Sequence, residues 1–476
     1  MRLRNLLAAA GLAGLAACTT VGPDYQEPTA SAPAQTPFVE STHGPFTGAE
    51  PLGRWWSLFR DPLLDQLVEQ ALSANTDLRG ASANLDRARA LLRETRSERL
   101  PSTTTSAGAS YGRASGAAIG SDRALSNSQY YDVGLDAGYQ LDLFGRLRRA
   151  TEASRADVGA AEAALDLARV TVAAETTRAY ADACNAGAQL AVAERSARVQ
   201  QQTFDLTRRQ VEGGRGTAFE TGQAGSLLEQ TRSAIPIFQG ERRAALYRLA
   251  VLTGRTPAQF PAPVASCADP LLLSTAIPIG DGASLLRRRP DVREAERNLA
   301  AATARIGAAT AQLYPDIRIG ASLGSSADSL GGLVSSAGPR FSLGPLLSWS
   351  FPNRRAARAR IVQANAESAA ALGRFDGTWL TALRETETSL ARYSSRQQQV
   401  TSLGRAQASG AEAARIARLR YQAGRESFQI VLDAERSLAQ SETLLAQAQA
   451  SQSSDLVNLF LALGGGWEAA PEPIAP

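Results

Sequence analysis

Four segments of the chain alternate apolar and polar residues with a period of two. They occupy residues 102–113, 129–142, 316–325 and 340–351. In the second segment, Tyr131, Val133 and Leu135 fall on odd positions, while Asp132 and Asp136 fall on even positions. Strict alternation predicts β-strands with one apolar face, and about ten residues is the length of a tilted strand that crosses a membrane. The pattern therefore predicts four membrane strands, with a soluble, half-buried sheet as the alternative.

Long stretches of helix-forming residues lie between the strands. Residues 144–212 and 353–422 lack proline and are dominated by Ala, Arg, Glu, Gln and Leu, which favour helix. At 1.5 Å per residue, each stretch predicts a rod of about 100 Å. A return helix follows each rod, with glycine-containing tips near 213–216 and 421–427 and return segments at 218–254 and 428–463. We therefore expect two helical hairpins with glycine at the turns.

The two halves of the sequence repeat each other. Aligning Gly214 with Gly424 superimposes the two tips, and Pro101 matches Pro315 in front of the strands. Such self-similarity predicts a duplicated structural unit. The expected organisation is a first repeat at 54–256, a linker at 257–282, a second repeat at 283–467 and a tail at 468–476.

The N-terminus carries the features of an export signal. An apolar run at residues 6–17 follows two arginines; it is too short to cross a bilayer but fits the core of a signal peptide. The run ends in Leu-Ala-Ala before Cys18, like a bacterial lipobox, so residues 1–17 are expected to be removed and Cys18 to be lipidated. Thr19, rather than Asp, follows the cysteine, which by lipoprotein sorting indicates the outer membrane. Cleavage at Ala-x-Ala without lipidation is the alternative. Residues 18–53, rich in Pro, Thr and Ser, predict an extended tether.

The composition excludes several kinds of catalysis. All 50 basic residues are arginine, and the chain has one histidine, His43, and one methionine, Met1. A Schiff-base lysine, a P-loop lysine and a His-rich metal site are thereby ruled out, and a Ser-His-Asp triad in the core is disfavoured. The 46 acidic residues are interspersed with the basic ones, so no basic patch indicates nucleic acid. We expect no enzyme, no metal ligands and no cofactor.

Two cysteines remain beyond the lipobox. Cys184 lies on the first rod, about 44 Å before Gly213, and Cys267 follows the return helix. The residues between Gly254 and Cys267 can cover the remaining distance, so the two cysteines are expected near each other. An oxidising periplasm permits a disulfide, and two inert buried thiols are the alternative.

Four strands are too few to close a membrane barrel. An open sheet edge in lipid leaves backbone groups unpaired, and the smallest natural barrels have about eight strands. Several chains must therefore share one barrel. Three chains give twelve strands, and the same threefold axis would wrap the long helices into a second, helical tube.

The order of several motifs resembles a known family. They are Trp55-Trp56, Asn75-Thr76-Asp77-Leu78, Arg289-Pro290-Asp291-Val292, Arg420-Tyr421-Gln422-Ala423-Gly424 and Gly464-Gly465-Gly466-Trp467. With the duplicated halves and the lipobox, they make nearly the whole mature chain similar to the TolC-like outer membrane efflux factors, specifically the NodT-type lipoprotein subgroup. The resemblance implies a mainly α fold with membrane β structure: a trimer with a twelve-stranded β-barrel, a periplasmic α-helical barrel and an equatorial collar that includes the linker.

The resemblance also implies a gate at the periplasmic tip. Asp433 would form a carboxylate ring when repeated by the threefold axis, while Tyr421 and Arg436 would hold the ring closed. Asp433 and Arg436 are three residues apart and so share a helix face. Glu220 matches an acidic gating partner of some relatives. Ile430 stands where a second ring acid can occur, so this chain is expected to bind cations less tightly. Ordinary solvated helix charges are the alternative for each of these residues.

Charged residues also fall on the polar face of the predicted strands. Asp132, Asp136 and Arg318 are expected to line the barrel interior. They would tune the ion preference of the pore, or they would only make the wall of a water-filled pore hydrophilic.

The function expected from the resemblance is an outer membrane exit duct of a tripartite efflux system. An inner-membrane resistance-nodulation-division pump would deliver substrate through a periplasmic adaptor that docks on the helical tip. A duct for type I protein secretion is the alternative within the class, and a structural lipoprotein coiled coil is the alternative outside it. Drugs, metal ions, dyes and solvents use similar ducts, so the sequence does not name the cargo.

Overall fold

The chain forms two compact units. The computed structural model describes residues 20–28, 36–113, 125–349 and 354–465, together with 115, 117, 120 and 122. The expected signal peptide, Cys18 and the C-terminal tail lie outside these residues. The strand unit comprises residues 1–28, 85–161 and 295–375, and the hairpin unit comprises residues 29–84, 162–294 and 376–476.

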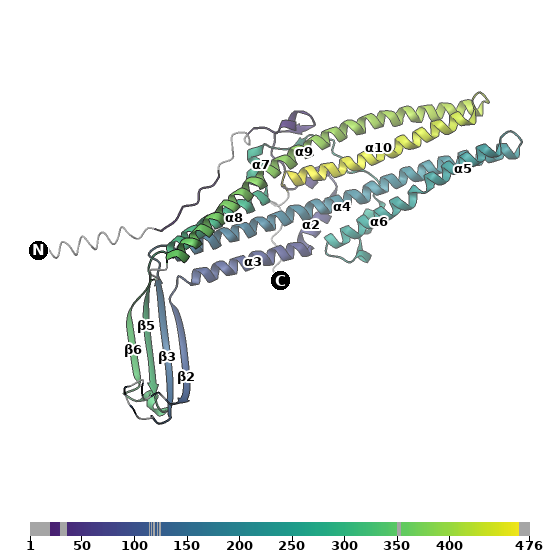
Figure 1. Ribbon diagram of the computed structural model, residues 1–476. Helices are drawn as coiled ribbons and strands as arrows, with labels where there is room; N and C mark the ends of the chain where they lie inside the picture. Colours follow the sequence, from purple (N-terminus) through teal and green to yellow (C-terminus); the bar gives the residue numbers. More distant parts are fainter. Residues whose placement is uncertain are drawn as a thin grey trace. The chain divides into compact units, whose positions relative to one another are not determined.

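The strand unit contains one antiparallel sheet of four strands. They are β2 (Ser102–Gly112), β3 (Ser128–Leu141), β5 (Asp316–Ala327) and β6 (Pro339–Ser348). The strands lie side by side in the order β2-β3-β5-β6 (Figure 1). The four strands are those that the period-two pattern predicts. The last strand ends at Ser348, and residues 350 and 351 of the expected segment lie outside the described residues.

The register of the sheet gives it one apolar face. Leu135 pairs with Leu323, which in turn pairs with Phe341, so these three side chains share a face. Phe341 is 85% exposed and Leu343 is 76% exposed. A soluble sheet would bury such residues against a core, so this face is built to contact something apolar. Leu346 breaks the alternation of β6, because it pairs with Arg318 and so lies on the polar face.

Small side chains allow the helices of the strand unit to pack closely. The helices that begin or end there are α3 (Thr76–Ser97), α4 (Arg146–Glu212), α8 (Pro290–Ala311) and α9 (Arg354–Gln422). Leu299 and Ala302 of α8 form a buried cluster with Ala371 of α9. One turn further, Ile306 packs against Ala364. Alanine at these positions has a small side chain, which lets α8 and α9 pack closely.

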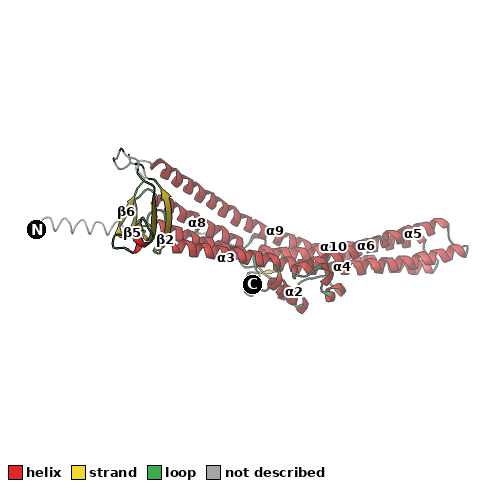
Figure 2. Cartoon of the chain, turned by 90° about the horizontal axis from the view of Figure 1, so that it is seen from below, coloured by secondary structure: helices red, strands yellow, loops and turns green. Residues whose placement is uncertain are grey.

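The hairpin unit contains both predicted hairpins. The first joins α4 to α5 (Ala218–Arg232) and α6 (Ala234–Leu252), and the second joins α9 to α10 (Phe428–Ala462), as Figure 2 shows. The expected single return helix at 218–254 is wrong, because the structure interrupts it at Ser233. Pro236 explains the break, since its ring would clash with the carbonyl of Arg232 in a continuous helix. In the first turn of α6 the same proline is tolerated.

The remaining elements of the hairpin unit include a 3-10 turn that carries a buried pair of tryptophans. They are α2 (Pro62–Ala74), α7 (Gly282–Arg288), a parallel pair formed by β1 (Phe46–Thr47) and β4 (Ile277–Pro278), and 3-10 turns at Val39–Thr42, Trp55–Phe59, Pro257–Gln259 and Ala262–Ser266. Trp55 stacks on Phe460 with ring centroids 4.7 Å apart, and neither Trp55 nor Trp56 is more than 1% exposed. The Trp-Trp motif therefore serves packing.

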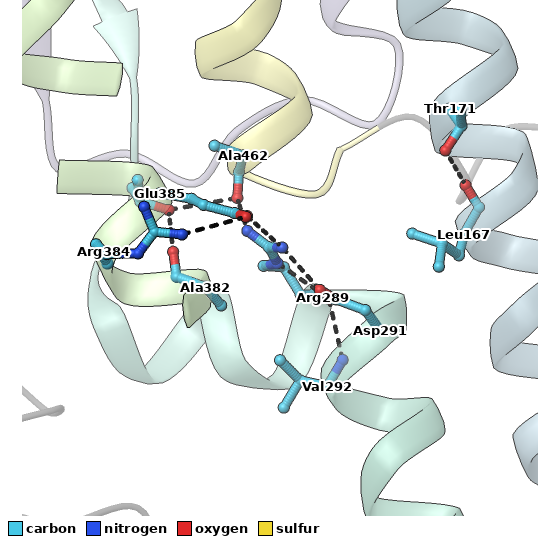
Figure 3. A network of polar contacts seen from close by, with 10 residues as sticks. Leu167, Thr171, Arg289, Asp291, Val292, Ala382, Arg384, Glu385 and Ala462 are labelled. Atoms are coloured by element: carbon cyan, nitrogen blue, oxygen red, sulfur yellow. Dashed lines mark hydrogen bonds and ion pairs between the residues drawn. The ribbon is translucent and has the colours of Figure 1, made fainter. Parts of the chain in front are cut away.

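An arginine joins three helices of the hairpin unit (Figure 3). Arg289, between α7 and α8, donates to Asp291 at 2.7 Å and to Glu385 of α9 at 2.9 Å. It also donates to the carbonyl oxygen of Ala462 at the end of α10, at 3.0 Å. Burial would lower the pKa of the Arg289 guanidinium, but its bonds to the two carboxylates raise it overall. The arginine-rich motif thus anchors the start of the second repeat.

Described parts of the expected tether, in residues 20–28 and 36–53, make hydrogen bonds to helices. In the strand unit, Arg149 donates to the carbonyl of Val21 at 3.3 Å and to Asp24 at 2.6 Å. In the hairpin unit, the backbone amides of Val39 and Glu40 donate to Glu387 at 2.7 and 3.1 Å. Side chains of the helices satisfy the backbone groups of this segment, and a Pro- and Ser-rich composition carries no signal of such contacts.

Among the described residues, no helix combines the length and the hydropathy needed to cross a membrane.

Candidate gate at the hairpin tips

The two hairpins turn with the same backbone geometry. Gly214 and Gly424 both have positive φ, of 70° and 69°. After each glycine, the next amide reaches back five residues, from Arg215 to Gln210 and from Arg425 to Arg420, at 2.8 Å in both cases. This is the pattern of a Schellman motif, in which a left-handed residue closes the helix. Glycine is favoured there because it has no side chain to clash.

Asp433 and Arg436 lie on one face of α10, one turn apart. Arg436 Nη1 is 3.3 Å from Asp433 Oδ1, and both side chains are about half exposed. The amide of Gln429 donates to the same carboxylate at 3.3 Å. An exposed pair of this kind contributes little to stability. The pair is therefore not needed to hold α10 together.

Tyr421 connects the two hairpins. Its hydroxyl donates to Gln210 Oε1, across from the end of α9 to the end of α4. Its ring lies 5.5 Å from that of Phe428, beside a buried cluster that includes Leu227 of α5. Burial raises the pKa of the Tyr421 phenol, and the carboxylate of Glu220 raises it further. The phenol therefore remains a hydrogen-bond donor at neutral pH.

Glu220 has a structural role at the start of α5. Its carboxylate accepts from the amide of Thr217 at 2.8 Å, and the hydroxyl of Thr217 accepts from the amide of Glu220 at 3.4 Å. This reciprocal arrangement is a capping box. Within this chain, the hydrogen bond in the capping box is the role of the Glu220 carboxylate.

Glu435 is a tip residue that sequence reasoning missed. It is 2% exposed, and its carboxylate accepts from the hydroxyl of Thr203 in α4 at 3.0 Å. The guanidinium of Arg418 lies 3.9 Å away. Burial raises the pKa of the Glu435 carboxyl, while the bond from Thr203 and the charge of Arg418 partly oppose the shift.

A signal for Glu435 was present in the sequence. Phe428, Val431, Leu432 and Glu435 follow the spacing of one helical face, and all four are buried. An acid on an apolar stripe indicates a buried, partnered carboxylate.

The polar face of the sheet carries the predicted pore residues. Asp132, Asp136 and Arg318 share this face by register. Asp132 accepts from Arg340 at 2.6 Å, a partner that the alternating pattern does not single out. Arg318 lies 3.4 Å from Asp316. The charges on this face are therefore partly paired with one another.

A disulfide joins Cys184 of α4 to Cys267 within the hairpin unit. The two Cα atoms are 4.8 Å apart, and Cys184 is fully buried. Arg242 donates to the carbonyl of Cys267 at 3.1 Å and so holds the same loop.

Comparison with known proteins identifies the class of this protein. The profile of the outer membrane efflux protein family matches residues 67–255 and again residues 283–465. The chain therefore belongs to the outer membrane efflux protein family, and the resemblance inferred from its motifs is confirmed. The two matches fall in the two halves of the chain, as expected of a duplicated unit. The family consists of efflux proteins rather than enzymes.

Individual relatives agree with this class. The chain is 30% identical over 457 residues to the toluene efflux pump outer membrane protein TtgC of Pseudomonas putida, covering 95% of this chain and 93% of that protein. It is 31% identical over 453 residues to the cation efflux system protein CusC of Escherichia coli O157:H7, covering 94% and 96%. The structure of the outer-membrane channel OprN superimposes with a TM-score of 0.89 at 37% identity, covering 94% of this chain and 100% of that one. The predicted fold class and an efflux function in the outer membrane are thus confirmed.

Proposed function

We propose that this efflux protein works as a homotrimeric exit duct, gated at its hairpin tips. An inner-membrane resistance-nodulation-division pump delivers substrate through a periplasmic adaptor, and the duct conducts it passively across the outer membrane. TtgC and CusC are named for toluene and cation efflux at nearly the same identity to this chain. The pump, rather than the duct, therefore sets the cargo.

The sheet is the observation that carries the proposal. Among the described residues, β2 and β6 each pair with a strand on one side only, so both edges of the sheet are open. Its apolar face is exposed, with Leu343 and Leu347 at 76% and 67%. An open edge is not tolerated in lipid. Three chains pairing β6 to β2 would close a twelve-stranded barrel with the apolar face outward and Asp132, Asp136 and Arg318 inward.

The gate is proposed at Asp433. Threefold repetition would place three carboxylates at the narrowing tip, where they bind cations and repel one another. Tyr421 connects the end of α9 to the end of α4 through Gln210, and Arg436 pairs with the Asp433 carboxylate on its own helix. Glu220 supports the turn of the first hairpin through its capping box.

The lipid anchor is proposed at Cys18. Thr20 accepts a hydrogen bond from Arg148 at 2.9 Å, and the amide of Val21 donates to the carbonyl of Phe144 at 3.3 Å. Phe144 follows the end of β3 closely. A lipid on Cys18 would thus be attached beside the membrane strands, and it would hold the protein in the outer membrane while the hairpins extend into the periplasm.

Conductance of the purified protein in planar bilayers tests the duct and the gate together. We expect Asp433→Ala to raise the resting conductance and to weaken block by a trivalent cation about tenfold, as a loss of roughly 1.4 kcal/mol implies. Glu412→Ala is the matched control, because Glu412 makes the same kind of exposed ion pair with Arg415 three residues on. A protein that forms no channels refutes the duct. Channels on which Asp433→Ala has no effect refute the gate.

A further inference from the structure

A cavity lined by arginines lies in the strand unit, where strands give way to helices. It has a volume of about 550 Å³ and is bordered by the ends of β3, β5 and β6 and by the first turns of α4 and α9. Its charged lining consists of Arg146, Arg318, Arg354 and Arg360 with Asp142 and Asp316. The arginines thus outnumber the carboxylates.

Both carboxylates are already engaged. Asp142 accepts from the amides of Leu147 and Arg148 at 3.0 and 2.8 Å and so caps α4. Asp316 lies 3.4 Å from Arg318. Each carboxylate keeps its single negative charge, but two carboxylates cannot balance four arginines.

The other three arginines lack a carboxylate partner among the described residues. Arg146 donates to the neutral Gln140 at 2.8 Å, and Arg360 donates to the neutral Gln312 at 2.7 Å. Arg354, at the start of α9, is exposed and makes no ion pair with the part of the chain that the structure describes. The cavity therefore holds uncompensated positive charge.

The cavity opens onto the polar face of the sheet. Gln140 pairs directly with Arg318, and Asp316 pairs with Ser348, so all four residues lie on that face. Asp132 lies on the same face. In the proposed trimer this face lines the pore, and the cavity would border the pore at the base of the barrel.

Aromatic contacts fix the wall of the cavity. Phe144 and Tyr314 stack with ring centroids 4.5 Å apart and nearly parallel planes. The indole of Trp349 donates to the carbonyl of Leu313 at 3.2 Å. These contacts hold the ends of β3, β6 and α8 together. The backbone near the arginines is therefore fixed. Guanidinium groups bind carboxylate and phosphate oxygens in pairs.

We propose that this cavity is a binding site for the anionic groups of solutes in the pore, namely carboxylates and phosphates. Three copies would make a positive zone at the base of the barrel, opposite in sign to the Asp433 ring at the tip. A solute would meet a cation-binding ring first and an anion-binding zone afterwards. The inference rests on the proposed trimeric duct, but it concerns a different site from the gate.

Ion selectivity tests the site. Wild-type protein and the double variant Arg354→Gln, Arg360→Gln are compared in neutral phosphatidylcholine bilayers under a KCl gradient, with citrate added as a multivalent anion. Citrate should block the wild type, and the double variant should shift the reversal potential toward cation selectivity and weaken the block about tenfold, or roughly 1.4 kcal/mol. Equal reversal potentials and equal block would overturn the proposal.

Arg355→Gln is the matched control. At about 100° per residue, Arg355 lies on the side of α9 opposite the residues that line the cavity, and it is exposed like Arg354. It should leave selectivity and block unchanged; an effect as large as that of the double variant would mean that arginine charge in general, not this cavity, is responsible. A failure to form channels would instead refute the duct itself.

A second arm distinguishes a free anion from a lipid headgroup. The citrate block is measured again in bilayers that contain phosphatidylglycerol, whose phosphate offers the same chemistry. A site in the pore should be blocked equally in both bilayers. Block that disappears when the anionic lipid is present would assign the cavity to lipid phosphate and overturn its place in the pore.

Discussion

The two hairpins share a turn but differ in their return arms. Their glycines adopt the same conformation, and their turns close with the same hydrogen bonds. After the first turn the return arm is broken at Ser233, whereas after the second it continues as one helix to Ala462. The residue aligned with Pro236 is Ala446, which is buried in the middle of α10. Duplication has thus kept the turn while the arms diverged.

The hairpins also begin their return arms differently. Thr217 and Glu220 form a capping box at the start of α5, but Ser427 makes no side-chain capping bond at the start of α10. Instead, Phe428 and Glu435 of α10 are buried against other helices. Both return arms bury apolar residues, but only the first has a side-chain cap at its start. The residues proposed for the gate lie mostly in the second hairpin, whose stability depends on its neighbours.

A third difference lies midway along the rods. Cys184 of α4 aligns with Ser394 of α9 in the alignment that matches Gly214 to Gly424. Cys184 binds the linker through a disulfide to Cys267, and Ser394 donates a hydrogen bond to the carbonyl of His43. Equivalent positions thus fix two different segments, one covalently and one by a hydrogen bond.

The disulfide should give the largest effect. Replacing both Cys184 and Cys267 by Ala should lower the free energy of unfolding by about 2–4 kcal/mol, because the bridge closes a long loop. Thermal unfolding of the purified protein measures the change. Ser394→Ala, at the aligned position, should cost only about 1 kcal/mol. Titration of the unfolded, unreduced protein should find neither of these thiols free; two reactive groups there would refute the bridge.

Glu435 should give a pH-dependent effect. Because burial raises the pKa of its carboxyl, the folded state holds more protons than the unfolded state above the ordinary glutamate pKa of about 4.3. Its contribution to stability therefore falls as pH rises through this window, by at most about 1.4 kcal/mol per pH unit. Glu435→Gln keeps an acceptor for Thr203 and removes the titration. The variant should gain stability relative to the wild type as pH rises.

Glu412→Gln is a control of opposite sign. The guanidinium of Arg415 lowers the pKa of Glu412, so its small contribution is present above the ordinary glutamate pKa and is lost as pH falls. Parallel pH profiles for the wild type and Glu435→Gln would contradict the assignment of a buried, titrating carboxylate.

The caps should give the smallest and most selective effect. Thr217→Ala should cost about 1 kcal/mol, because it removes the hydroxyl that caps α5. Ser427→Ala should cost almost nothing, because Ser427 makes no such bond. Hydrogen exchange at the first amides of α5 and α10 distinguishes the two variants. Equal losses of protection at both turns would show that the two arms begin in the same way.

The sequence alone determined the elements and their repetition. Period-two alternation located all four strands, and proline-free stretches located both rods to within about two residues. Gly214 and Gly424 marked both turns. These features are local: alternation, helix propensity and glycine's tolerance of positive φ act within a few residues, so a single chain reveals them without knowledge of its fold.

Only the tertiary structure decided which side chains meet. It brought the hydroxyl of Thr203 to the carboxylate of Glu435 and paired Arg340 with Asp132. It also bound Asp24, near the N-terminus, to Arg149. The partners in each case are more than a hundred residues apart, and no local pattern connects them. These distant contacts then set the pKa of a group such as the Glu435 carboxyl, because packing removes its water and brings charged and hydrogen-bonding partners to it.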